Sequence, residues 1–96
     1  MNAKVREHLS FEGRVQEVGF RYKMKMHAEH YHVTGWVRNE YDGSVSAELQ
    51  GFPEDIARVV WELYQDRYIR IDWISRRQIA LAEDETGSRG SIPKFV

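Results

Sequence analysis

Residues 9–24, LSFEGRVQEVGFRYKM, decide the fold, because the spacing of apolar residues changes within them from two to about four. Residues 9–15 alternate between apolar and polar side chains, as in a strand with one buried face. From residue 20 the apolar residues recur at helical spacing, and residues 16–19 follow neither pattern. The sequence therefore predicts a strand, a short loop and a helix in direct succession.

The helix is expected over residues 20–32, because Gly35 follows and favours a break in the helix. Four apolar residues fall on one stripe of it: Phe20, Met24, Ala28 and Tyr31. On the same reading, Tyr22 and Met26 widen the apolar side. The strand before the helix buries Leu9, Phe11 and Val15.

Two further strands are predicted over residues 34–38 and 44–50. The residues between them, 39–43, carry the Asp-Gly signal of a hairpin turn. A second helix is expected to begin within residues 51–55, which hold a proline and two acids suited to a first turn. Its apolar stripe consists of Ile56, Val59, Val60 and Leu63, with Trp61 and Tyr64 at the margin of the core.

A fourth strand follows, in which Ile69, Ile71 and Trp73 alternate with polar residues. Residues 83–90 are expected to form a polar loop, and residues 92–96 a short closing strand at a sheet edge. The order βαββαβ in a single domain, residues 1–96, predicts an α+β ferredoxin-like fold, the split βαβ plan. In this fold two helices cover one face of an antiparallel sheet.

Composition excludes several classes of protein. The 96 residues carry 14 Lys and Arg against 15 Asp and Glu, and they contain no cysteine. A chain without basic excess is unlike a dedicated nucleic-acid binder, and no apolar run approaches the roughly 20 residues of a membrane span. We expect a cytoplasmic monomer with no nucleic-acid partner, no membrane attachment and no Cys-based metal site or nucleophile.

The strand-to-helix junction, GRVQEVGFR over residues 13–21, is the segment suited to chemistry. The first N–H groups of a helix have no intrahelical partners and lie at the positive end of its dipole, so they attract anions. Arg21, in the first turn, adds a guanidinium fork that matches two phosphate oxygens. Since the chain has almost no net charge, an anion here is held by local geometry.

The residues Gly13 to Arg21, followed by GWVRN at 35–39 and DGSV at 42–45, resemble an acylphosphatase. The likeness is nearly continuous over residues 13–51, and two separated motifs at the right distance make it specific. The resemblance implies an enzyme without metal or cofactor that cleaves acyl phosphates to a carboxylate and inorganic phosphate.

The resemblance also implies the roles of individual residues. Arg21 binds the phosphate, and Asn39 orients the attacking water. The backbone N–H groups of the loop complete the phosphate cradle; its residues are Gln16, Glu17, Val18, Gly19 and Phe20. The leaving carboxylate has a conjugate acid of pKa roughly 4, so it needs little help from a general acid. We expect direct attack by water without a covalent phosphoenzyme.

Glu17 stands where this family usually has glycine, a residue that tolerates unusual φ angles and close approach to a ligand. At a dielectric constant of about 20, a like charge ~5 Å from the phosphate costs on the order of 3 kcal/mol. Two interpretations follow. Either Glu17 faces water, where screening removes most of that cost, or it pairs with Arg21 in the empty site and weakens the enzyme.

Other functions were weighed against this one. His27, His30 and His32 suggest a zinc site, but no partner carboxylate at ligand spacing supports it, and surface histidines are favoured. Trp36 and Trp73 invite comparison with RNA-binding sheets of this topology, but the basic-aromatic motif of such sheets is absent. An anion-binding module made inactive by Glu17 remains the main alternative to an enzyme.

Overall fold

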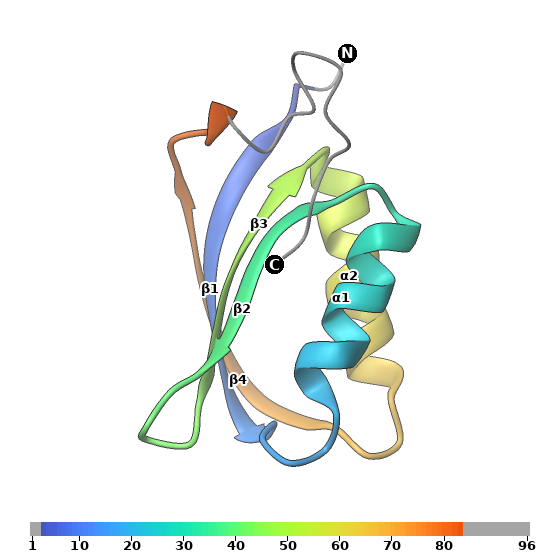
Figure 1. Cartoon of the computed structure of the whole chain (residues 1–96), viewed down its shortest axis with the longest axis vertical. Coiled ribbons are helices and arrows are strands. Elements are labelled where there is room, and N and C mark those ends of the chain that lie inside the picture. Colours follow the sequence, from blue (N-terminus) through green and yellow to red (C-terminus); the bar gives the residue numbers. More distant parts are fainter. Residues whose placement is uncertain (1–2, 84–96) are drawn as a thin grey trace.

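The computed structural model describes residues 3–83. Its elements follow the order βαββαβ: β1 (Val5–Arg14), α1 (Phe20–His30), β2 (Thr34–Asn39), β3 (Val45–Gly51), α2 (Pro53–Gln65) and β4 (Arg70–Ile79). The sheet has the strand order β2-β3-β1-β4 with every neighbouring pair antiparallel. Both helices cover the same face of this sheet (Figure 1). The predicted α+β ferredoxin-like fold is therefore confirmed.

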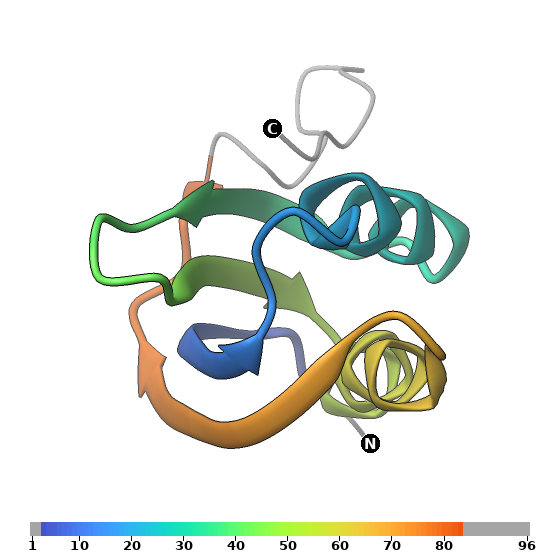
Figure 2. The same ribbon diagram turned by 90° about the horizontal axis from the view of Figure 1, so that it is seen from below.

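The core lies between the sheet and the two helices, which lie side by side (Figure 2). Leu9 and Phe11 of β1 are fully buried, as their alternation with polar residues predicts. The predicted stripe of α2 is buried at all four positions, and the ring of Phe20 in α1 packs 5.0 Å from that of Phe11. Helix periodicity and strand alternation thus place most of the core correctly.

The stripe of α1 is narrower than predicted. Tyr22 is 72% exposed and Met26 44% exposed, so neither widens the apolar side. The helix ends at His30, two residues early, because His32 adopts a left-handed backbone with φ 59°. On α2, Trp61 is 61% exposed and lies outside the core rather than at its margin.

Strand β4 departs from the predicted alternation at a bulge. Glu12 of β1 faces Trp73, whereas the next residue, Gly13, faces Ile71, so β4 has one extra residue between them. Because of the extra residue, the side chains of β4 after the bulge point to the opposite face of the sheet from the one that simple alternation predicts. Trp73 is consequently 62% exposed, although simple alternation puts it on the face of Ile71, and Ile74 packs against the core instead.

Other differences lie at element ends. Strand β1 begins at Val5, four residues before the predicted start, and β4 extends to Ile79. The predicted closing strand at 92–96 and most of the polar loop at 83–90 lie outside the described residues. Within the described residues, neither helix is long and apolar enough to span a membrane.

Three connections meet at one end of the molecule, shown at the bottom of Figure 1. They are the loop from β1 to α1, the hairpin between β2 and β3, and the turn from α2 to β4. These segments are distant in sequence, and the βαββαβ topology brings them together. Any site built from the motif at residues 13–21 therefore has the hairpin on one side and the α2–β4 turn on another.

Gly13 allows β1 and β4 to approach closely at the bulge. Its φ is +134°, and a Cβ atom placed on it would lie 2.2 Å from the carbonyl oxygen of Arg70. The amide nitrogen of Asp72 would lie 2.8 Å from the same Cβ, and because both of these neighbouring atoms belong to the backbone, turning a side chain cannot relieve the contact. The glycine that opens the motif is thus a packing requirement of the strand before the loop.

We predict that Gly13→Ala lowers the free energy of unfolding by roughly 3 kcal/mol or more, because it adds a backbone clash to an unfavourable φ. Gly43→Ala is the matched control, since Gly43 also has a positive φ, 94°, but has open space around its Cα. That substitution should cost only about 1 kcal/mol. Urea denaturation measures both. Equal losses would show that the close approach at Gly13 has no energetic weight.

Candidate active site

The loop between β1 and α1 carries two left-handed residues, Glu17 with φ 62° and Gly19 with φ 78°. Gly19 is also the N-cap of α1, and no side chain among the described residues caps the helix there. The first intrahelical bond runs from the N–H of Lys23 to the carbonyl of Gly19, 2.9 Å. The N–H groups of Phe20 to Tyr22 therefore remain available to an anion.

The side chain of Gln16 fastens this loop to the hairpin. Its Nε2 donates to two backbone carbonyls, those of Glu40 at 2.7 Å and Ser44 at 2.8 Å. Each is a good hydrogen bond, of net value about 1 kcal/mol. The loop that begins α1 is thereby held in a fixed position against the end of β2, where Asn39 lies.

Arg21 and Asn39 line one hollow of about 230 Å³. The other residues that line it are Val15, Glu17, Gly19, Phe20 and Tyr22. The structure therefore brings together the two residues to which the resemblance assigns catalysis, along with most of the loop. Gln16 is absent from the lining because its side chain is turned toward the hairpin, and Val18 lines a neighbouring cavity instead.

Arg38, beside Asn39, takes no part in this hollow. Its guanidinium lies 5.0 Å from the ring centre of Trp36, and its Nε donates to Glu40 at 3.0 Å. This agrees with the alternation of β2, which sends neighbouring side chains to opposite faces. The guanidinium of Arg21, by contrast, is exposed and makes no ion pair with any carboxylate of the described residues.

The hairpin beside the hollow is fixed by its own carboxylates. The Ser46 hydroxyl and the Arg38 guanidinium both donate to Glu40, and they lower the pKa of that carboxyl. Asp42 accepts from the hydroxyl of Ser44 at 2.6 Å and from its N–H at 2.9 Å, which lowers the pKa of Asp42. Ionised carboxylates therefore hold the turn that follows Asn39.

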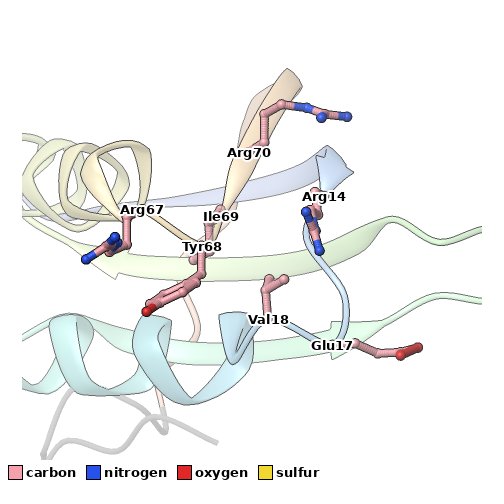
Figure 3. A pocket seen from close by; sticks show the side chains of 7 residues that line it. All are labelled: Arg14, Glu17, Val18, Arg67, Tyr68, Ile69 and Arg70. Atoms are coloured by element: carbon pink, nitrogen blue, oxygen red, sulfur yellow. The ribbon is translucent and has the colours of Figure 1, made fainter.

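Glu17 is exposed, and no ion pair joins it to Arg21 within the part of the chain that the structure describes. Figure 3 shows its carboxylate pointing away from Arg14 and Val18, out of the neighbouring cavity. Its φ of 62° explains why glycine suits this position. The effect of Glu17 on phosphate binding stays a prediction that substitution tests.

The histidines form no metal centre in residues 3–83, where no group of three or more His, Asp or Glu side chains is placed to hold a metal ion. The ring of His30 instead packs edge-on against Tyr31, with ring centres 4.7 Å apart.

Two features of the site escaped the sequence reasoning. The Gln16 side chain binds carbonyls 24 and 28 residues away, and local spacing does not reveal such partners. The neighbouring cavity, of about 420 Å³, joins the loop to residues 67–69 of the α2–β4 turn and to Arg70 at the start of β4. Only the topology, which brings the turn beside the loop, could have indicated it.

Comparison with known proteins gives one consistent family. The acylphosphatase family model matches residues 7–89. An acylphosphatase of Thiobacillus denitrificans is 55% identical over 53 residues, 55% of this chain and 60% of that protein. One from Thermococcus kodakarensis is 45% identical over 62 residues, 65% of this chain and 68% of that protein. The matches span about half to two thirds of the length of these curated relatives.

Solved structures agree. The crystal structure of acylphosphatase from Bacillus subtilis superposes with a TM-score of 0.75 at 29% sequence identity. The superposition covers 82% of this chain and 89% of that one.

The lowered pKa of Glu40 predicts a pH dependence of stability. A carboxyl whose pKa is lower in the folded state stabilises the fold above its unfolded pKa, about 4.5, and loses that contribution as the pH falls. We expect Glu40→Gln to be less stable than wild type at pH 7 and to lose less stability between pH 6 and pH 3. Urea denaturation at each pH measures this. Glu29→Gln, on the exposed face of α1, is the charge-matched control. If the free energy of unfolding changes with pH identically in Glu40→Gln and wild type, the prediction is wrong.

Proposed function

The chain belongs to the acylphosphatase family, and we propose that it hydrolyses the carboxyl–phosphate bond of acyl phosphates. The observation that carries the proposal is the hollow in which Arg21, Asn39 and the free N–H groups at the start of α1 meet. These are a guanidinium, backbone donors and a side-chain amide. Such a set suits the transfer of a phosphoryl group to water.

The phosphoryl group binds between Arg21 and the loop. The guanidinium donates to two of its oxygens, and the N–H groups of residues 20–22 donate to the others. In phosphoryl transfer the charge in the transition state spreads over these equatorial oxygens, so fixed donors directed at them lower the barrier. Gln16 contributes indirectly, since its two hydrogen bonds keep the loop in place before substrate arrives.

Asn39 holds the attacking water in line with the bond that breaks. An amide is too weak a base to ionise water, but it can orient one against the phosphorus. The water oxygen forms a bond to phosphorus as the bond to the acyl oxygen breaks, and the electron pair leaves with the carboxylate. The water proton passes to the phosphate or to solvent.

The hollow is large enough for the phosphoryl group and the attacking water. A water molecule occupies about 30 Å³ in the liquid, so roughly 230 Å³ accommodates the phosphoryl group and one water. The proposal includes action as a monomer in the cytoplasm, without a metal ion or cofactor.

Hydrolysis of benzoyl phosphate in the presence of EDTA tests this function. We expect turnover by wild type, a loss in kcat/KM of about 1,000-fold in Arg21→Ala and of about 100-fold in Asn39→Ala. Gln78→Ala is the control for Asn39→Ala, because it removes a carboxamide from an exposed position on β4 outside the hollow. Absence of turnover by wild type, with inorganic phosphate still bound through Arg21, would favour the inactive anion-binding module.

Glu17→Gly tests whether the Glu17 carboxylate competes with phosphate for Arg21. Because Glu17 makes no ion pair with Arg21 among the described residues, we expect kcat/KM and phosphate affinity to stay within about threefold of wild type at 0.15 M salt. Glu17→Gln removes the charge but keeps a side chain at the left-handed position, and it separates electrostatics from backbone strain. A rise of tenfold or more in both variants would show that Glu17 competes with phosphate.

A further inference from the structure

The cavity of about 420 Å³ beside the phosphate loop has no role in the proposed hydrolysis. It is lined by Arg14, Glu17, Val18, residues 67–69 of the α2–β4 turn, and Arg70 at the start of β4 (Figure 3). Glu17 lines both this cavity and the hollow that holds Arg21. The two spaces therefore adjoin at Glu17.

Arg14 gives the cavity its charge. In Figure 3 its guanidinium extends from the end of β1 toward Val18, and no carboxylate of the described residues pairs with it. Arg67 lies at the far end, with its guanidinium 5.5 Å from the ring centre of Tyr68. Arg70 turns away and binds Asp72 at 3.1 Å, so its charge is already balanced.

The carboxylates nearby leave Arg14 unbalanced. Glu17 is directed away from it (Figure 3), and Asp66 is held by Lys23 at 2.9 Å. Between the arginines the cavity has apolar surface from the half-buried side chain of Val18 and from the exposed ring of Tyr68. The cavity thus combines an apolar lining with an unpaired guanidinium at the end nearest the phosphate loop.

We infer that this cavity binds the acyl part of the substrate and selects acyl phosphates whose acyl chain ends in a second carboxylate. The inference rests on the proposed function. A short methylene chain packs on Val18 beside the loop, and its terminal carboxylate receives hydrogen bonds from Arg14. Arg14 is then a specificity residue that contacts the part of the substrate that does not react.

Succinyl phosphate and butyryl phosphate test the inference, because their acyl chains have the same length and differ only in the terminal carboxylate. Wild type should prefer succinyl phosphate in kcat/KM. Arg14→Gln should lower the ratio of the two kcat/KM values about fivefold, the scale of one exposed charge-assisted contact. Arg77→Gln is the control. It removes the same charge from an exposed site on β4 that lies about 20 Å from Arg14 along the sheet. This substitution should leave the ratio unchanged.

Binding of non-hydrolysable analogues separates this inference from the proposed function. In these phosphonates a methylene group replaces the bridging oxygen of each substrate, and calorimetry measures their affinities. Preferential binding of the carboxylate analogue, lost in Arg14→Gln, would support the cavity's role even if wild type hydrolysed neither substrate. Equal binding of the two analogues by wild type, or an equal loss of affinity for both in Arg14→Gln, would overturn the inference. Hydrolysis of either substrate would still uphold the proposed function.

Discussion

The two hydrogen bonds donated by the Gln16 carboxamide are the constraint on which the site depends. They join a loop that follows β1 to a hairpin that follows β2, and the two segments have no covalent or strand-to-strand connection at this point. Without them, the start of α1 and Asn39 would be positioned only by separate elements. With them, the N–H groups at the start of α1 and the amide of Asn39, to which we assign the phosphoryl group and the attacking water, belong to one unit.

Backbone conformation supplies the second requirement. The loop turns from strand to helix through left-handed residues at 17 and 19, and it directs the first N–H groups of α1 outward. Close packing at Gly13 fixes where that turn begins, because β4 approaches there within the space a side chain would need. Glu17 bears the conformational cost of a side chain at a left-handed position, and its carboxylate points away from the neighbouring cavity.

The sequence predicted the parts of this fold that rest on local periodicity. The stripe of α2 was correct at all four positions, because burial against a sheet imposes a 3.6-residue period whatever the partner. Trp73 was misplaced because the bulge opposite Gly13 is a property of two paired strands, and neither strand alone reveals it. Tyr22 was misplaced because its place in the helix pattern does not show how wide a face the sheet covers.

The same distinction holds at the site. The strand-to-helix junction around Arg21 predicted an anion site, and the family resemblance assigned a role to Asn39. The topology brings Arg21 and Asn39 into one hollow. The side-chain role of Gln16 and the cavity beside Arg14 depend on contacts between segments far apart in sequence. Neither feature can be seen without the tertiary structure.

If the Gln16 side chain holds the loop as an anion cradle, inorganic phosphate must bind there, and less tightly when Gln16 is removed. The most direct measurement is a titration of the isotopically labelled protein with inorganic phosphate, followed through its backbone amide resonances. We expect saturable shifts at residues 17–22 and in the Asn39 side chain, an affinity about tenfold weaker in Gln16→Leu, and unchanged core resonances. Shifts confined to the surroundings of Arg14 and Arg67, or an unchanged affinity in Gln16→Leu, would contradict it.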